Sequence, residues 1–226
     1  MGPPPPLRNR VNEVRLDHLI LGVSDLGRAA DVVSTTLGFA PVPGGRHVGR
    51  GTANRLMRLG PDSYLELLGP DPDQTGTQWI APEAVGVGRL IGWALRSSNI
   101  EEDAAQLRRT GFDLGPIGSM QREAPQGLLE WRMTETRLEN GVMALPFLID
   151  WGASPHPTES LPCGPELLSL RVLMPDPERL DFVVEHLGGL LVVEGAREPR
   201  LEAVIRAADR TQVILSGLET EVERRV

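Results

Sequence analysis

LDHLILGVSDLGRAADVVSTTLG, Leu16–Gly38, decides how the rest of this chain is interpreted, because a stretch of the same kind occurs three times. A short apolar run leads into a polar turn, an amphipathic segment follows and a glycine closes it, which predicts a strand, a helix and a helix stop. The second copy is IGWALRSSNIEEDAAQLRRTGF, Ile91–Phe112, and the third is LLSLRVLMPDPERLDFVVEHLGG, Leu167–Gly189. From the residue that opens the helix to the closing glycine, the copies measure 13, 12 and 12 residues, so we interpret them as repeats.

The composition predicts a globular protein without nucleic-acid or membrane partners. The 226 residues, 40% of them hydrophobic, are enough to bury a core. A formal net charge of -8 argues against nucleic acid, because neutralising phosphates needs a basic face. The single cysteine, Cys163, cannot form an intrachain disulfide, and the apolar runs are shorter than a membrane span. We therefore expect a cytoplasmic protein.

The repeats and the proline-rich stretches between them divide the chain into six parts. These are a disordered lead-in at 1–13, a βαβββ module at 14–70, a linker at 71–88, a second βαβββ module at 89–152, a proline-rich joint at 153–165 and a third βαβββ-like module at 166–226. Within the first module, the glycine-rich stretch 41–52 is expected to be irregular. A lone third module would expose an apolar sheet face, so we expect it to pack on the other two or to pair with a second copy in a homodimer.

Several stretches carry a resemblance to a known family. The openings LDHLILGV (16–23) and LIGWALRS (90–97), the closing strands YLELLG (64–69) and PFLIDWG (146–152), and the segment GGRHVGRGTANRL (44–56) resemble the glyoxalase-like domain proteins of the vicinal oxygen chelate superfamily. The resemblance implies an α+β fold. Tandem βαβββ modules would form an incomplete mixed-sheet barrel around a cavity, with a third related module at the C-terminus. The superfamily includes isomerases, lyases, dioxygenases and metal-free binders, so the activity stays open.

The resemblance also implies a divalent metal (zinc, nickel, iron or manganese), held by one residue from the first strand and one from the last strand of each module. Carried over by position, the first module supplies His18 and Glu66, whose alternative role is to hydrogen-bond each other. The second module has Gly92 at the place that matches His18. Its last strand offers Asp150 or Ile149, depending on the alignment, and a one-residue slip reverses the face of a strand. At best His18, Glu66 and Asp150 would bind the metal, with Glu66 or Asp150 moving a proton.

The segment GGRHVGRGT, 44–52, is a candidate for binding an anion. It places Arg46, His47 and Arg50 among four glycines, so guanidinium groups and backbone N–H groups can converge on an oxyanion, although a plain connector is the alternative. Asn54 on the next strand is a candidate for the same role. The stretch lacks the closing GK[ST] of a phosphate-binding P-loop, and we expect no nucleotide cofactor.

Two further arginines are candidate ligand-binding residues. Arg96 shares a strand face with Gly92 and is expected to point into the cavity, with an exposed edge position as the alternative. Arg132 is a candidate second anion clamp. His156, between two prolines, is expected at the surface.

These observations support two hypotheses from different functional classes. In the first, the chain is a glyoxalase-like lyase or isomerase in which a metal polarises a small oxygenated metabolite and a carboxylate moves a proton. In the second, the same fold binds an anionic small molecule without a metal, through Arg50, Arg96 and Asn54. The absence of a histidine at Gly92 favours the second hypothesis.

Overall fold

The computed structural model describes residues 15–74, 85–109, 111–112, 114–125, 127–218 and 224–225; the predicted lead-in and much of the predicted linker lie outside these ranges. The first module consists of β1 (Arg15–Gly22), α1 (Leu26–Leu37), β2 (Val42–His47), β3 (Thr52–Arg58) and β4 (Tyr64–Pro70). The second consists of β5 (Arg89–Arg96), α3 (Ile100–Arg109), β6 (Ile117–Ala124), β7 (Gly127–Thr134) and β8 (Phe147–Asp150). The C-terminal part consists of η1 (Pro157–Glu159), β9 (Glu166–Met174), η2 (Pro177–Leu180), α4 (Asp181–Leu187), η3 (Gly188–Leu190), β10 (Leu191–Gly195), β11 (Arg200–Arg206), β12 (Gln212–Leu215) and β13 (Arg224–Arg225).

The first helix forms where the sequence predicts it. Asp25 caps its N-terminus, because the carboxylate accepts a hydrogen bond of 2.9 Å from the backbone N–H of Arg28. Gly38 ends the helix in the left-handed conformation with φ 75°, which glycine adopts without a steric penalty. The buried face, which includes Val33 and Leu37, packs on the outside of the sheet.

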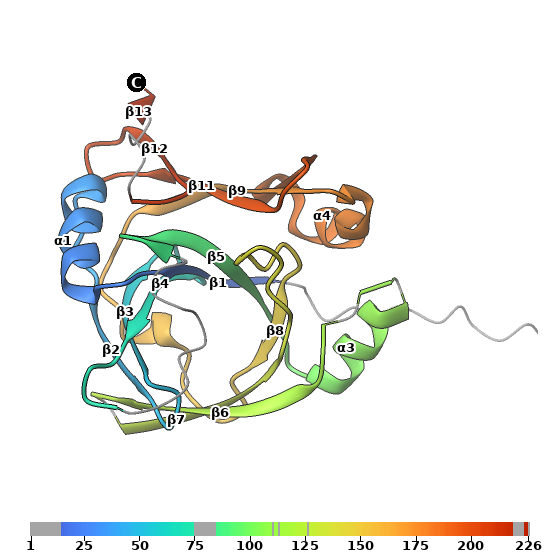
Figure 1. Cartoon of the computed structure of the whole chain (residues 1–226), viewed down its shortest axis with the longest axis horizontal. Coiled ribbons are helices and arrows are strands. Elements are labelled where there is room, and N and C mark those ends of the chain that lie inside the picture. Colours follow the sequence, from blue (N-terminus) through green and yellow to red (C-terminus); the bar gives the residue numbers. More distant parts are fainter. Residues whose placement is uncertain are drawn as a thin grey trace, which may run out of the picture.

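The eight strands of the first two modules form one barrel in the order β1-β4-β3-β2-β6-β7-β8-β5 (Figure 1). The sheet is mixed, since β1 runs parallel to β4 and β5 parallel to β8, while the other neighbours are antiparallel. The predicted α+β barrel of two modules is therefore confirmed. We expected an incomplete ring, whereas the structure closes it through the two residue pairs that join β2 to β6.

The closing strand β2 corrects the prediction that 41–52 is irregular. β2 pairs with both β3 and β6, although its sequence VPGGRH is poor in residues typical of strands. A Cβ at Gly45 would lie 2.0 Å from the carbonyl oxygen of Glu123, so only glycine lets β2 approach β6 this closely. Sequence propensity missed the strand because its glycines serve a close approach of two backbones.

The third module repeats the order of elements but not the pairing of strands. Its sheet has the order β10-β9-β11-β12-β13, in which β9 pairs in parallel with the next strand, β10. In the barrel modules the first strand instead pairs in parallel with the last strand, as β1 does with β4. The repeat seen in the sequence therefore extends to the strand-helix unit and not to the sheet that it builds.

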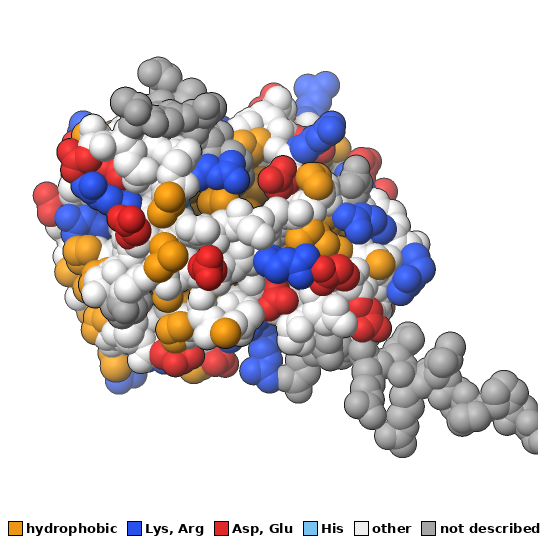
Figure 2. Space-filling view, turned by 90° about the horizontal axis from the view of Figure 1, so that it is seen from below, with side chains coloured by type: hydrophobic (Ala, Val, Ile, Leu, Met, Phe, Trp, Pro, Cys, Tyr) orange, Lys and Arg blue, Asp and Glu red, His pale blue; other side chains and the backbone are white. Residues whose placement is uncertain are grey.

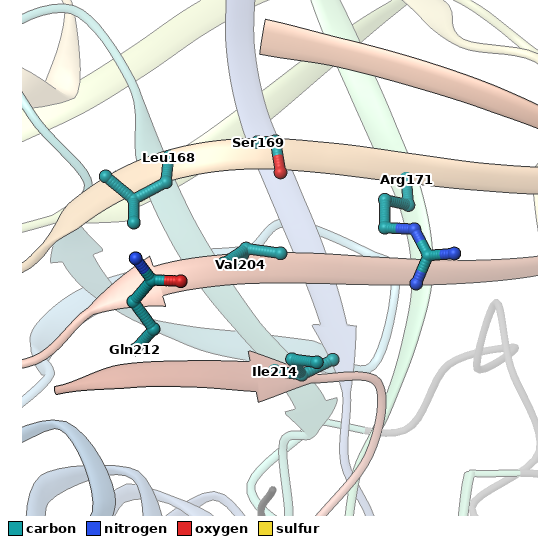
Figure 3. A pocket seen from close by; sticks show the side chains of 6 residues that line it. All are labelled: Leu168, Ser169, Arg171, Val204, Gln212 and Ile214. Carbon is teal, nitrogen blue, oxygen red and sulfur yellow. The ribbon is translucent and has the colours of Figure 1, made fainter. Parts of the chain in front are cut away.

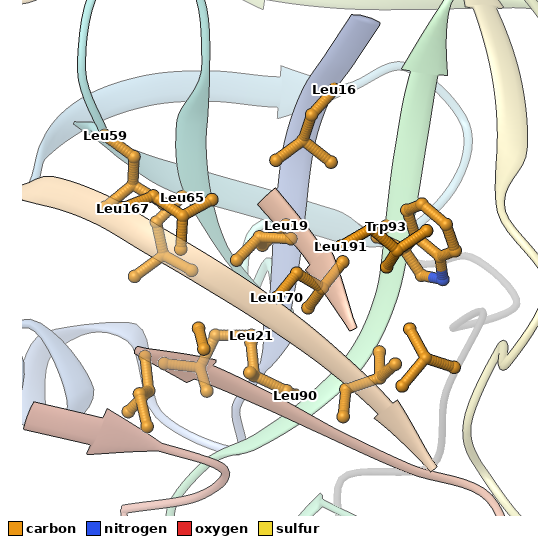
Figure 4. Packing of buried hydrophobic residues seen from close by; sticks show 14 of the residues in the cluster. Leu16, Leu19, Leu21, Leu59, Leu65, Leu90, Trp93, Leu167, Leu170 and Leu191 are labelled. Carbon is orange, nitrogen blue, oxygen red and sulfur yellow. The ribbon is translucent and has the colours of Figure 1, made fainter. Parts of the chain in front are cut away.

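One apolar face of the third sheet covers the outside of the barrel. Leu167, Leu170 and Leu191 belong to the same buried cluster as Leu19 of β1 and Trp93 of β5, and Figure 4 shows them packed between the two sheets. Burying leucines in this way is worth about 1.5–3 kcal/mol for each side chain. Of the two arrangements expected for the third module, packing on the barrel is the one observed, so its apolar face does not require a second copy.

The surface is charged and mixed in sign. On the face drawn in Figure 2, acidic and basic side chains are interspersed and hydrophobic ones are scattered between them. No helix among the described residues is long and apolar enough to span a membrane.

Candidate functional site

The inside of the barrel combines an apolar wall with a buried polar cluster. The wall contains large side chains from both modules, namely Leu56, Tyr64, Trp131, Phe147 and Trp151. Within it lie five buried polar side chains, each from a different strand: His18, His47, Asn54, Glu66 and Arg122. Buried polar groups in this number are costly unless they serve each other or a ligand.

Glu66 lies at the centre of this polar cluster. Asn54 donates a hydrogen bond of 2.6 Å from Nδ2 to Glu66 Oε1, which fixes the carboxylate. The Nε2 atom of His18 lies 3.6 Å from Oε2, and that of His47 lies 3.7 Å from Oε1. Both distances exceed a hydrogen bond, so each imidazole faces the carboxylate without being bonded to it.

Each imidazole is held in place through its other nitrogen. His18 donates from Nδ1 to Asp17 Oδ1 at 2.7 Å and stacks on Tyr64, with ring centroids 4.7 Å apart. His47 Nδ1 lies 3.0 Å from Thr52 Oγ1. Burial lowers the pKa of His47 to about 4, although the charge of nearby Glu66 opposes this shift. His47 is therefore an uncharged imidazole at neutral pH.

A β-bulge turns Asp17 toward the same region as His18. The register of β1 against β5 slips by one residue at Asp17, so two successive side chains no longer point to opposite faces. The buried Asp17 Oδ2 accepts hydrogen bonds from Arg96 Nε (2.9 Å), His156 Nε2 (3.1 Å) and Trp151 Nε1 (3.2 Å). Burial alone would raise the pKa of Asp17, but the hydrogen bonds from His156 and His18 outweigh it and hold this pKa well below its usual range.

The structure thus brings together four of the residues singled out in the sequence. His18, His47, Asn54 and Glu66 meet inside the barrel. Arg96 is linked to them indirectly, because its guanidinium binds Asp17, which is the hydrogen-bond partner of His18.

Asp150 does not belong to this cluster, which corrects its proposed roles as metal ligand and proton-transfer group. Phe147 and Ile149 of β8 contribute to the cluster inside the barrel, so the alternation of the strand turns Asp150 to the outer face. There its Oδ1 accepts a hydrogen bond of 2.9 Å from the backbone N–H of Gly152, and its charge acts on Arg132. The alignment anchored on the closing glycine, which selects Ile149, was the right one.

Three predicted anion-binding arginines also lie away from the barrel interior. Arg46 forms ion pairs with Asp71 and Asp73, and Arg132 pairs with Glu101 of α3. Arg50 is exposed in the turn that follows β2. The structure therefore places these three side chains outside the polar cluster.

Sequence reasoning missed three members of the site, namely Asp17, Arg122 and His156. Arg122 is buried inside the barrel beside His47, and it shares one face of β6 with Met120 and Ala124, a period-two pattern that could have identified it. His156 was predicted at the surface, and this prediction is wrong, because His156 hydrogen-bonds to Asp17. The residues around His156 in the sequence do not indicate a partner in β1.

The donor set does not fit the four-ligand metal site that the family implies. At the place that matches His18, the second module has Gly92, where a Cβ would lie 2.1 Å from the methyl carbon of Met143. In β8, the last strand of the second module, the inward-facing residue is Ile149, whose side chain cannot bind a metal. Within the described ranges, no three His, Cys, Asp or Glu residues are grouped so as to hold a metal ion. The second module therefore contributes no metal ligand, and we derive no step through a metal.

Chelation tests this conclusion. Because the second module offers no donors, dialysis against EDTA is expected to leave the melting temperature and the response to small ligands unchanged. Differential scanning fluorimetry before and after dialysis, with metal analysis by mass spectrometry, provides the measurement. Bound transition metal that is lost on chelation, with a fall in melting temperature, would contradict the conclusion.

A second concave feature lies on the outer face of the third sheet. Its lining residues come from β9, β11 and β12 and include Leu168, Arg171 and Ile214 (Figure 3). Arg171 is already paired there with Glu194 and Glu202. Since its charge is compensated, this groove is a weaker candidate than the barrel interior.

Comparisons with known proteins agree with the fold. A family model described as a glyoxalase-like domain matches residues 16–188. The crystal structure of a hypothetical protein from Staphylococcus aureus is 15% identical, with a TM-score of 0.64, and the alignment covers 93% of this chain and 98% of that one. This coverage includes the third sheet, so the whole three-part fold is shared.

Weaker likenesses cover a smaller share of the chain. A Streptomyces coelicolor methylmalonyl-CoA epimerase in complex with 2-nitronate-propionyl-CoA is 23% identical with a TM-score of 0.41, over 62% of this chain and 98% of that one. A hypothetical protein from Bacillus halodurans is 17% identical with a TM-score of 0.42, over 63% of this chain and 97% of that one. No curated protein matches this chain.

Proposed function

The chain belongs to the glyoxalase-like domain family, and from this premise we propose that its barrel interior binds a small oxygenated metabolite and moves a proton on it without a metal. The observation that carries the proposal is the buried Glu66 carboxylate, which two oriented imidazoles face across gaps of 3.6 and 3.7 Å. Polar groups that converge in an apolar interior without bonding to each other are typical of ligand sites.

Glu66 is the proton acceptor in this proposal. Asn54 occupies Oε1 through its 2.6 Å hydrogen bond, so Oε2, which faces His18, is the oxygen that takes the proton. The substrate C–H bond next to a carbonyl breaks, its electron pair moves to the carbonyl oxygen, and Glu66 returns the proton to carbon or to oxygen. The uncharged His47 is placed to hydrogen-bond an oxygen of the substrate.

Asp17 and His18 support this chemistry as a pair. The carboxylate of Asp17 accepts the Nδ1 proton of His18, which fixes the tautomer and turns Nε2 toward Glu66. Because Asp17 also accepts hydrogen bonds from Arg96 and His156, the orientation of His18 is tied to two further elements of the fold. The pair therefore holds the Nε2 atom of His18, which is an acceptor in this tautomer, toward Glu66 and the ligand.

The alternative is binding without chemistry. The same cluster would then sequester the ligand, as the second hypothesis from the sequence holds. The two functions differ in one observable, the exchange of a carbon-bound hydrogen with solvent.

Replacing Glu66 with glutamine tests the proposal. Compounds from a panel of small hydroxy acids, oxo acids and hydroxy ketones that raise the melting temperature are incubated in D2O, and loss of a C–H signal is followed by proton NMR. The wild type is expected to exchange a proton of at least one of these compounds, and Glu66→Gln to do so about 10²–10⁴-fold more slowly while still binding it.

Asp150→Asn is the matched control, because it removes a carboxylate from the outer face of the same barrel. It is expected to exchange the proton at the wild-type rate. Binding without exchange would establish the sequestering function instead. If no compound of the panel binds, or if both variants exchange alike, the proposal is wrong.

A further inference from the structure

Arg122 is the least satisfied charged group inside the barrel. Its side chain is 2% exposed, and neither Nε nor Nη2 has a hydrogen-bond partner within the part of the chain that the structure describes. It lies on β6 opposite His47 of β2, on the face of the strand that points inward. The guanidinium is thus enclosed next to the polar cluster.

A buried guanidinium needs a negative partner. Arginine keeps its proton in a protein, and burying an unpaired charge is strongly unfavourable. Three other arginines of the barrel have carboxylate partners: Arg46 pairs with Asp71, Arg96 with Asp17 and Arg132 with Glu101. Among the described residues, no carboxylate forms an ion pair with Arg122. An anion supplied from outside the chain is the group that this position lacks.

The two free nitrogens indicate the shape of that anion. Nε and Nη2 lie on one edge of the guanidinium and present two parallel N–H groups. This fork matches the two oxygens of a planar carboxylate in bidentate geometry.

A second unsatisfied atom lies in the same interior. Asn54 donates through Nδ2 to Glu66, but its Oδ1 is buried without a partner among the described residues. An amide oxygen accepts hydrogen bonds and cannot donate them. The group that completes Asn54 is therefore a donor, such as a hydroxyl.

From these two unpartnered groups we infer that the ligand of the barrel is a small hydroxycarboxylate, with its carboxylate on the Nε–Nη2 edge of Arg122 and its hydroxyl donating to Oδ1 of Asn54. The inference rests on the proposed function, since it names the class of ligand that the same interior takes. It also places Glu66, which Asn54 holds, beside the hydroxyl-bearing part of the ligand.

Three probes distinguish the contact of the carboxylate with Arg122 from the contact of the hydroxyl with Asn54. Lactate carries both the carboxylate and the hydroxyl, propionate carries the carboxylate alone, and lactamide carries the hydroxyl without the charge. Thermal shift and calorimetry at equal concentrations are expected to rank lactate above propionate, with lactamide inactive. Inorganic phosphate is the fourth probe, and binding of phosphate as tight as that of lactate would overturn the preference for a carboxylate.

Arg122→Met is the decisive variant. Replacing a buried charge with an apolar side chain of similar volume is often neutral for stability, so this variant is expected to fold. Its affinity for lactate and for propionate should be at least about tenfold lower than that of the wild type. Arg122→Lys keeps the charge but loses the two parallel N–H groups, so its affinity should lie between those of Arg122→Met and the wild type. Arg132→Met removes an arginine from the outer face of the neighbouring strand and should bind like the wild type.

The outcomes separate this inference from the proposed function. If lactate binds through Arg122 but Glu66→Gln changes no proton exchange, the ligand class holds and the proton-transfer role fails. If the acids bind equally to Arg122→Met and to the wild type, or if none binds the wild type, the inference is overturned. If Glu66 exchanges a proton on an uncharged ligand, the proposed function is supported, but the inference that the ligand is a hydroxycarboxylate is wrong.

Discussion

Replacing Asp17 with alanine is expected to lower the free energy of unfolding by about 3–5 kcal/mol. The fully buried carboxylate accepts hydrogen bonds from His18, Arg96, His156 and Trp151, so its removal leaves the Nε–H of Arg96 and an indole N–H without their acceptor. Breaking a buried charge pair costs more than the pair contributes, because the remaining charge stays desolvated. Urea denaturation followed by tryptophan fluorescence gives the measurement.

Asp31→Ala is the control for this experiment, since Asp31 is exposed on α1. It should change stability by no more than about 0.5 kcal/mol, as surface substitutions usually do. Asp17→Asn, which keeps the volume but loses the charge, should lie between the control and Asp17→Ala. If Asp17→Ala is no less stable than the control, Asp17 does not anchor β1 to the segment that carries His156.

Lowering the pH from about 6.5 to about 4 is expected to cost about 3 kcal/mol of stability through His47. Burial lowers the pKa of His47 to about 4 in the folded chain, whereas the unfolded chain has the ordinary histidine value. Between the two values the unfolded state binds a proton that the folded state does not, so stability falls as the pH falls. Urea denaturation at a series of pH values measures the slope.

His47→Gln should flatten the slope in this pH range, whereas His186→Gln should leave it unchanged, because His186 lies on α4 away from the barrel interior. Asp17 contributes to the pH dependence of stability at a lower pH than His47. Its depressed pKa contributes stability that is complete above the ordinary carboxylate pKa, near about 4, and is lost below it. A slope that persists in His47→Gln would show that other groups carry the dependence.

The family resemblance predicts the barrel, and it also singled out His18 and Glu66, which the structure places 3.6 Å apart. Local signals predict the helix α1, namely the cap at Asp25 and the stop at Gly38. These features depend on residues a few positions apart, which is the range over which periodicity and capping act.

The parts that could not be predicted depend on contacts distant in the sequence. The bulge that turns Asp17 inward arises from the register of β1 against β5, and the closure of the barrel from the approach of Gly45 to β6. Which face of β8 carries Asp150 could not be predicted, because shifting the alignment of this four-residue strand by one residue exchanges its two faces. Within the described ranges, Nε and Nη2 of Arg122 have no partner, so the ligand proposed for them is inferred from the structure and not from the sequence pattern.

A crystal structure of the protein soaked with lactate tests the central claim, that the barrel interior is the ligand site, most directly. The account predicts the carboxylate on the Nε–Nη2 edge of Arg122, the hydroxyl within hydrogen-bond distance of Asn54 Oδ1, and Glu66 beside the C–H bond. Lactate bound instead on the outer face of the third sheet near Arg171, or a barrel in which His18 and Glu66 lie far apart, would contradict it.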